Sequence, residues 1–557
     1  MAVDFLTSAL YAKMLKEGAA RLNEGRKTVN DLNVFPIPDG DTGDNMYMTI
    51  AEGFKAADTA ASESLGKCSA AAARGMLLGA RGNSGVILSR IFAGIAKGLE
   101  GLERASVEEY SRAYLNGVEE AYASVSEPVE GTILTVFRES THYAASRITP
   151  ASTLETFFVD LISELEASLS RTPDLLDVLK EAGVVDSGGA GLDYITLGMY
   201  DAVLGKCSDS ADVPVLSGGA KAVNIDLFTE DSVLDFGYCT EFLLRLQTSK
   251  VGAVESFDES VIKDYLGSVG ESLVFFRDGS VIKVHVHTPA PGDILSACQK
   301  WGEFLTVKVE NMTLQHEESV FASDAPKKGP SVEFRKKKTN AFVAVASGEG
   351  LCEAFRAAGA DAVIEGGQTM NPSAASFIEA FDGIEAENIF VFPNNSNIVL
   401  TANQAADLYD KANVTVIPTK DVGAGYVAMA SIDTSSKNPS DIIDSASQIL
   451  ENVETAMIST AIRDTEMDGV TVRCGEYIGF RKGEVLVCES SRDGAAEKLC
   501  DSLDIADHDV VLIFSGKDVP AAEAQGLKEK LGLRYRRTDF MLTDGCQPVY
   551  DYIIVLC

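Results

Sequence analysis

A short acidic loop, residues 33–46 with the sequence NVFPIPDGDTGDNM, has the residue types and spacing of a cation site. Its glycines permit the tight turns that direct neighbouring side chains to one point. Carboxylates this close repel one another unless a hard cation lies between them. A capped turn before the following helix is the alternative interpretation. The loop carries three carboxylates within six residues: Asp39, Asp41 and Asp44.

The spacing of this loop favours magnesium over calcium. Counting Asp39 as the first position of a calcium-binding EF-hand loop puts Asp44 where glycine is required and Ile50 where the bidentate glutamate belongs. Magnesium uses few protein carboxylates and completes its octahedron with water and phosphate oxygens. The sequence therefore predicts a cation that is shared with a phosphate-bearing ligand.

Three glycine-bearing loops accompany the acidic one: GARGNSG (79–85), PVEGTILTV (128–136) and VDSGGAGL (185–192). A glycine-rich turn at a helix start presents free backbone N–H groups to phosphate. Each loop alone is equally compatible with an ordinary helix-start turn, since none has the spacing of a known phosphate loop. Together with the acidic loop they predict a metal–nucleotide site.

A second candidate metal site lies in the middle of the chain. In SVIKVHVHT (280–288) the alternation puts His285 and His287 on one side of a strand, and in GYCTEFLL the residues Cys239 and Glu241 likewise share a side. A neighbouring strand would bring the thiolate to the imidazoles as a zinc site. A hydrogen-bonded, half-exposed histidine pair is the alternative.

The elements that must position these residues fall into three blocks. At about 150 residues per domain, 557 residues predict three or four domains. Residues 1–204 have helical periodicity and predict an all-α domain, residues 223–321 predict a small α+β domain, and residues 340–557 alternate strands and helices as an α/β domain does. A basic run in the linker 322–340 is either a solvated tether or a docking site for an acidic partner.

Charge and hydropathy exclude several classes of protein. The net charge of −35 argues against general binding of nucleic acid or anionic membrane. We expect a cytoplasmic protein without an integral membrane segment, because the N-terminus lacks signal-peptide features and no 18-residue apolar run occurs. Ten scattered cysteines without a CxxC motif predict buried thiols rather than disulfides.

The motifs DGDTGDNM, GARGNSGVILS, PVEGTILTV and AGVVDSGGAG, in this order, resemble the nucleotide-binding domain of the dihydroxyacetone kinase L-subunit type. The whole chain resembles the ATP-binding A subunit of bacterial fatty acid kinase. This resemblance implies an antiparallel α-helical barrel in which aspartates hold two Mg²⁺ ions that bridge the ATP phosphates. It makes Asp39 and Asp41 catalytic magnesium ligands. It also implies these ATP contacts: Thr42, Gly43, Asp44, Asn45, Asn83, Ser84, Thr132, Ile133, Asp186, Ser187 and Gly188.

The chain departs from the family pattern at two positions. A third aspartate usually stands five residues before the DGD pair, where this chain has Val34, and Asn33 and Asp44 are the candidates to replace it as a magnesium ligand. Asp44 itself replaces the usual threonine, which leaves its role open between metal ligand and phosphate contact.

The resemblance extends to the other two blocks. It implies that Cys239, His285 and His287 are zinc ligands, with His316 either a fourth ligand or a solvent-facing helix residue. In the last block, EGGQTMNPS (365–373) and FPNNSNIVL (392–400) are binding loops or ordinary turns, and their order resembles the DegV-type lipid-binding fold. We therefore expect a DegV-like fatty-acid-binding carrier as partner. We also expect the protein to form a homodimer.

The function that these expectations favour is phosphoryl transfer from Mg-ATP to the carboxylate of a carrier-bound fatty acid, which gives acyl phosphate and ADP for phospholipid synthesis. A kinase of a small hydroxylated, dihydroxyacetone-like metabolite and a non-catalytic metal-binding scaffold are the alternatives.

Overall fold

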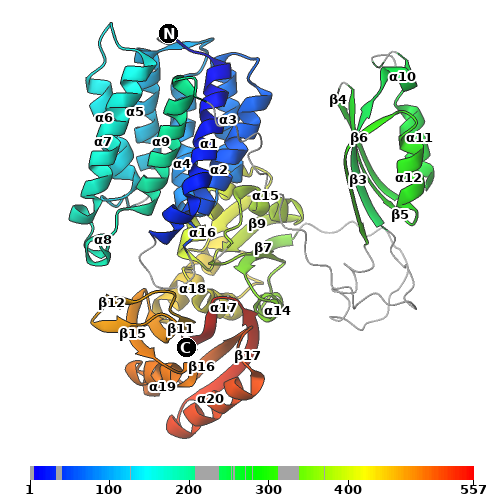
Figure 1. Cartoon of the computed structure of the whole chain (residues 1–557). Coiled ribbons are helices and arrows are strands. Elements are labelled where there is room, and N and C mark those ends of the chain that lie inside the picture. Colours follow the sequence, from blue (N-terminus) through cyan, green and yellow to red (C-terminus); the bar gives the residue numbers. More distant parts are fainter. Residues whose placement is uncertain are drawn as a thin grey trace. The chain divides into compact units, whose positions relative to one another are not determined.

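The computed structural model describes residues 5–32, 40–125, 127–206, 238–252, 254, 257–269, 271–278, 280–311, 338–368 and 370–557. These form two compact units (Figure 1): Met1–Val215 together with Arg335–Cys557, and Leu216–Phe334 by itself. The first unit contains an all-α block followed by an α/β block, and the second is a small α+β domain. The predicted three-part fold class is confirmed.

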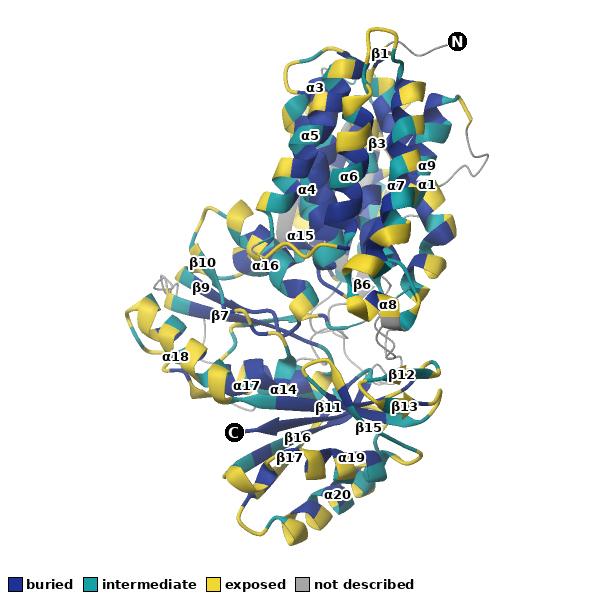
Figure 2. Cartoon of the chain, turned by 90° about the vertical axis from the view of Figure 1, so that its left-hand side faces the viewer, coloured by how far each residue is buried: buried dark blue, intermediate teal, exposed yellow. Residues whose placement is uncertain are grey.

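The N-terminal block is a ring of antiparallel helices around an apolar core. Helices that follow one another in the sequence pack side by side, and α9 packs against α1, which closes the ring. Figure 2 shows that the buried residues lie on the inner sides of these helices. The helices are α1 (Ser8–Asp31), α2 (Thr42–Thr59), α3 (Leu65–Gly79), α4 (Gly82–Gly98), α5 (Val107–Ala123), α6 (Ile133–Ser146), α7 (Leu154–Leu175), α8 (Asp177–Ala182) and α9 (Ser187–Val203).

Local sequence signals explain where several of these helices begin. The side chain of Thr7 accepts from the Leu10 N–H at the start of α1, and Ser106 forms a reciprocal capping box with Glu109 at the start of α5. A two-stranded pair, β1 (Phe5–Leu6) with β2 (Ala105–Ser106), was not expected in this block. No helix in the described ranges is both long and apolar enough to span a membrane.

The middle unit is an antiparallel sheet with helices packed on one face. The strand order is β4-β5-β3-β6, and its core contains Phe242, Val284 and Ile294. Its elements are β3 (Tyr238–Leu246), α10 (Thr248–Val251), α11 (Ser260–Val269), β4 (Glu271–Asp278), β5 (Val281–Thr288), α12 (Pro291–Cys298) and β6 (Gly302–Asn311).

The C-terminal block begins with the expected parallel βαβ arrangement. Its four-stranded sheet has the order β10-β9-β7-β8, with every pair parallel. Strand β8 forms one edge of this sheet. The elements are β7 (Lys338–Ala346), α14 (Glu349–Ala357), β8 (Ala362–Glu365), α15 (Ala374–Asp382), β9 (Ala386–Phe392), α16 (Ser396–Leu408), β10 (Asn413–Val416) and α17 (Val422–Ser431).

A second, mostly antiparallel sheet forms the rest of this block, with the order β15-β14-β11-β18-β16-β17. The helix that begins at Pro439 ends at Asn452, and residues 454–460 then form a strand between β14 and β18 in which four of the seven residues are buried. The elements are α18 (Pro439–Asn452), β11 (Glu454–Thr460), β12 (Thr465–Met467), β13 (Val470–Val472), β14 (Tyr477–Arg481), β15 (Glu484–Glu489), α19 (Arg492–Ser502), η3 (Ile505–Asp507), β16 (Val510–Gly516), α20 (Ala521–Arg534), β17 (Asp539–Gln547) and β18 (Tyr550–Leu556).

Candidate functional site

The starts of α2, α4, α6 and α9 meet at one end of the helical block, and the predicted ATP contacts lie at these starts. Each start carries about half a positive charge and backbone N–H groups without intrahelical acceptors. Four such ends together favour an anionic ligand. Three close approaches join them: Ser187 Oγ donates to Thr42 Oγ1 at 3.2 Å, a Cβ added to Gly82 would lie 2.6 Å from Asn45 Nδ2, and one added to Gly188 would lie 3.1 Å from Ile133 Cβ.

Asp41 stands at the N-cap of α2, but its carboxylate does not cap that helix. The Asn30 side chain, from the last turn of α1, takes over this role. Asn30 Oδ1 accepts from the N–H of Gly43 at 2.7 Å and from the N–H of Asp44 at 3.3 Å. The Asp41 side chain therefore does not serve as the cap of its own helix.

Asp44 ties the beginning of α2 to the end of α1. Its Oδ2 accepts from Asn30 Nδ2 at 2.6 Å, and its Oδ1 lies 3.2 Å from Arg26 Nε. Both carboxylate oxygens are thus held by donors of the chain itself. The roles of Asp44 as metal ligand or phosphate contact stay predictions, and either would require this pairing to change.

The loop 79–85 lies against the start of α2. Gly82 has φ +57°, a left-handed conformation that favours glycine, and the neighbouring Asn45 is buried. Asn83 Oδ1 is buried without a hydrogen-bond partner among the described residues, although its Nδ2 donates to Asn397 Oδ1 at 3.3 Å. Burial lowers the pKa of the Arg81 guanidinium, and the charge of Glu52 opposes that shift.

Asp186 joins the starts of α6 and α9. Its Oδ2 accepts from the Gly189 N–H at 2.7 Å, and the N–H groups of Ile133 and Gly188 also bond its carboxylate. Burial raises the pKa of Asp186 to about 6, and these three N–H groups oppose the rise. The Asp186 carboxyl group is therefore largely removed from water and links two helix starts by accepting hydrogen bonds from their N–H groups.

The remaining predicted ATP contacts lie in first turns or directly before them. Thr132 is the N-cap of α6 but donates its hydroxyl to the Val129 carbonyl at 2.8 Å, so it does not cap the helix. Gly131 before it has φ +84°. Ser84, in the first turn of α4, is half-buried. The structure thus brings together every predicted ATP contact, all of which lie in described ranges.

Two predicted magnesium ligands, Asn33 and Asp39, lie outside the described residues. The site residues that the structure does describe nevertheless suit a divalent cation bound together with phosphate. It offers the Asp41 carboxylate, side-chain amides at Asn45 and Asn83, and a buried orphaned amide oxygen on Asn83. These are hard oxygen ligands of the kind that magnesium prefers.

Sequence reasoning missed Asn30 and Arg26, which hold the start of α2. Both lie inside a helix, and no local motif marks a helical asparagine as the cap of the next helix. It also missed Gln404 of α16, which is 1% exposed, donates to the Leu77 carbonyl at 2.5 Å and accepts from Arg90 Nε at 3.1 Å. Through Gln404 the α/β block packs on α3 and α4.

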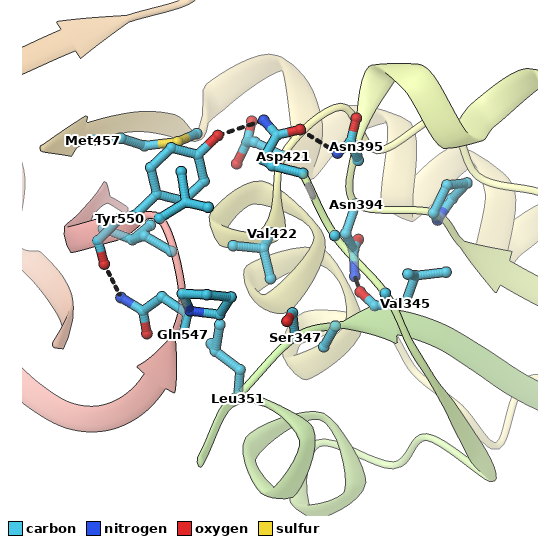
Figure 3. A pocket seen from close by; sticks show the side chains of 18 of the residues that line it. Val345, Ser347, Leu351, Asn394, Asn395, Asp421, Val422, Met457, Gln547 and Tyr550 are labelled. Atoms are coloured by element: carbon cyan, nitrogen blue, oxygen red, sulfur yellow. Dashed lines mark hydrogen bonds between the residues drawn. The ribbon is translucent and has the colours of Figure 1, made fainter. Parts of the chain in front are cut away.

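The C-terminal block has a partly open pocket where β7 and β9 end (Figure 3). Strand order reverses there, since β8 and β9 lie on opposite sides of β7, and ligands of α/β sheets bind at such points. Figure 3 shows Asn394 and Asn395 facing Tyr550 across the pocket. Gln368 joins the two sides: Asn395 Nδ2 donates to its Oε1 at 2.5 Å, and its Nε2 donates to the Tyr550 hydroxyl.

In the middle unit the backbone register pairs the predicted zinc residues. Strand β3 lies beside β5 with Cys239 opposite His287 and Glu241 opposite His285. This is the neighbouring-strand arrangement that the zinc hypothesis requires. The side chains at these positions, and the whole of His316, lie outside the described residues, so the zinc site stays a prediction. No cluster of three metal-ligating side chains occurs in the part that is described.

Known families match the chain in three successive parts. They are the DAK2 domain over residues 36–201, the middle domain of proteins like the fatty acid kinase A subunit over 235–319, and the C-terminal domain of the same proteins over 341–556. The matches follow the helical, α+β and α/β parts of the fold.

The chain is similar to full-length relatives and, over part of its length, to solved structures. Protein YloV of Bacillus subtilis is 36% identical over 560 residues and an uncharacterized protein of Staphylococcus epidermidis is 34% identical, each with 100% of both chains covered. A fatty-acid-binding DegV family protein of Thermus thermophilus matches with TM-score 0.29 and 11% identity over 39% of this chain and 99% of its own. The dihydroxyacetone kinase of C. freundii matches with TM-score 0.28 and 19% identity over 36% of each chain. Because the chain is 36% identical to YloV over the full length of both proteins and matches the three domain families, it belongs to the family of the fatty acid kinase A subunit.

Proposed function

We propose that this protein transfers the γ-phosphoryl group of Mg-ATP to the carboxylate of a fatty acid that a separate DegV-like carrier presents. The bond from the γ-phosphorus to the β,γ-bridging oxygen breaks, a bond from phosphorus to a carboxylate oxygen forms, and ADP leaves. The observation that carries the proposal is the meeting of four helix starts beside Asp41.

The residues of the site suit this chemistry because it needs positioning and charge neutralisation more than proton transfer. A carboxylate acceptor is ionised at neutral pH, so it needs no general base. The helical block contains one histidine, His142, which is exposed in the third turn of α6 and away from the helix starts. First-turn N–H groups of α2, α4, α6 and α9 would hold the phosphates.

Magnesium held by Asp39 and Asp41 would supply positive charge that neutralises the phosphate oxygens. A protein with net charge −35 needs such a local device to hold a polyanion. Asn33 and Asp44 remain the candidates for a further ligand, and we propose two magnesium ions on the family pattern. Asn45, Asn83 and Thr42 orient the phosphates by hydrogen bonding in this account.

We also propose a zinc ion held by Cys239, His285 and His287 in the middle domain, supported by the backbone register of β3 with β5. Elemental analysis of the purified protein tests it. Wild type should contain zinc, and Cys239→Ser combined with His285→Ala should contain none. Undiminished zinc in that double variant would refute the assignment.

An ATP-consumption assay with and without a fatty-acid-loaded carrier tests the main proposal. We expect consumption that depends on the carrier and is abolished by Asp41→Ala, while the variant keeps the wild-type circular dichroism spectrum. Consumption with dihydroxyacetone and no carrier would instead favour the small-metabolite kinase. Zinc binding without ATP consumption under any condition would favour a scaffold.

A further inference from the structure

The loop after β8, residues 366–373, belongs to the C-terminal block but lies against the acidic start of α2. Asn371 Nδ2 donates to Asp41 Oδ2 at 2.6 Å. Arg81 Nη1 donates to the Asn371 carbonyl at 2.8 Å, and the Ala374 N–H donates to the Ala80 carbonyl at 3.3 Å. Three polar contacts therefore fix this loop on the predicted nucleotide end of the helical block.

The side-chain amide of Asn371 is only half satisfied. The residue is 2% exposed, and its Oδ1 is buried without a hydrogen-bond partner among the described residues. Leaving a buried acceptor unpaired is destabilising, so native structures rarely keep one without a reason. An amide oxygen is also a hard ligand for magnesium or calcium.

The position of Asn371 relative to Asp41 suits a shared cation. Rotation of the amide by half a turn about its last bond would exchange Oδ1 and Nδ2 without moving the backbone. Asp41 and Asn371 would then present two oxygens near the 2.6 Å separation now seen. Neighbouring ligands of an octahedron with magnesium bond lengths lie about 2.9 Å apart.

We propose that Asn371 supplies its amide oxygen to the cation held by Asp41, so that the C-terminal block completes the Mg-nucleotide site of the helical block. The inference rests on the proposed function, because it assumes the cation site at Asp41. It goes further by placing a ligand in another domain, 330 residues away along the chain. Nucleotide binding and contact between the two blocks would then be linked.

Titration calorimetry on the full-length protein tests the proposal, with a non-hydrolysable ATP analogue at a series of Mg²⁺ concentrations. Asn371→Ala should weaken Mg-dependent nucleotide binding roughly 10-fold or more, as loss of a metal-site partner typically does. Binding measured in EDTA should not change. Asn413→Ala is the matched control, because Asn413 is an exposed asparagine at the opposite, amino end of the same sheet, and its binding should equal that of wild type.

Asn371→Asp separates a ligand from a simple hydrogen-bond donor. A carboxylate oxygen can bind the cation but cannot donate to Asp41, so this variant should keep Mg-dependent binding within about threefold of wild type. Binding as weak as that of Asn371→Ala would overturn the proposal. Wild-type binding and Mg²⁺ dependence in Asn371→Ala would overturn it too, with the proposed function intact. Absence of Mg-dependent nucleotide binding in the wild-type protein would instead contradict the proposed function.

Discussion

Two acidic side chains of the helical block have pKa values that desolvation raises well above the ordinary value. Besides Asp186, the α9 residue Asp193 has a pKa that burial raises to about 6, with the charge of Glu166 adding to the rise and Arg21 opposing it. Its Oδ1 is buried without a hydrogen-bond partner among the described residues. Such a group is protonated more readily in the folded chain than in the unfolded chain, where carboxyls titrate near the ordinary value of 3.8.

The sign of the pH effect follows from this difference. Between pH 3.8 and about 6 the folded state binds more protons at Asp193, so this group lowers the free energy of unfolding as pH rises. Asp193→Asn removes that loss and should gain stability over wild type, more at about pH 7.5 than at about pH 5. Urea unfolding at both pH values measures the difference in the free energy of unfolding between the variant and wild type. Asp174→Asn is the control, because it makes the same charge change at an exposed site. An equal gain in stability at both pH values for Asp193→Asn would contradict the assigned pKa shift.

At the scale of elements, the sequence predicted the helix starts but not the partners that join them. The loops 79–85, 128–136 and 185–192 were found because glycine and short polar residues mark helix starts. Strand β8 was missed because its four residues, AVIE, lie between helical segments and are too short to show alternation. The loop that contains Asn371 was a candidate binding loop, but the contact of Asn371 with Asp41 could not be predicted, since it depends on how two blocks pack.

The close approach of α2 and α4 gives a prediction with a matched control. Gly82→Ala would force a Cβ to 2.6 Å from Asn45 Nδ2, whereas Gly101, with φ +75°, has nothing within 4 Å of the same position. Both substitutions place alanine in a left-handed conformation at a cost of about 1–2 kcal/mol. Thermal unfolding should therefore occur at a lower temperature in both variants. Nucleotide affinity, measured by titration calorimetry, should fall only in Gly82→Ala, and equal affinities would contradict the assigned role of this loop.

At the scale of the whole first unit, the α/β block packs on the helical block through α16 and the loop before α15. The hydrophobic periodicity of the sequence predicted the blocks and their fold classes, because helices and strands have different periodicities. It could not predict which surfaces meet. The polar contacts of Gln404 with Leu77 and Arg90 join segments more than 300 residues apart, and no local pattern encodes such a pairing.

Gln404→Ala tests that packing. The change leaves the Leu77 carbonyl and the Arg90 side chain without this buried partner, which should cost about 1–3 kcal/mol. Scanning calorimetry should show the first unfolding transition at a lower temperature than in wild type. Gln448→Ala, on the exposed side of α18, should leave the transition unchanged. An unshifted transition in Gln404→Ala would show that this contact does not stabilise the unit.

Phosphoryl transfer to a carboxylate gives an acyl phosphate, which can be detected directly. Wild-type protein and Asp41→Ala are each incubated with ATP, Mg²⁺ and a fatty-acid-loaded DegV-type carrier, and acyl phosphate is trapped with hydroxylamine as the acyl hydroxamate. Wild type should give hydroxamate equal in amount to ADP, and Asp41→Ala should give none. ADP release without acyl hydroxamate, or equal hydroxamate from both proteins, would contradict the proposed function.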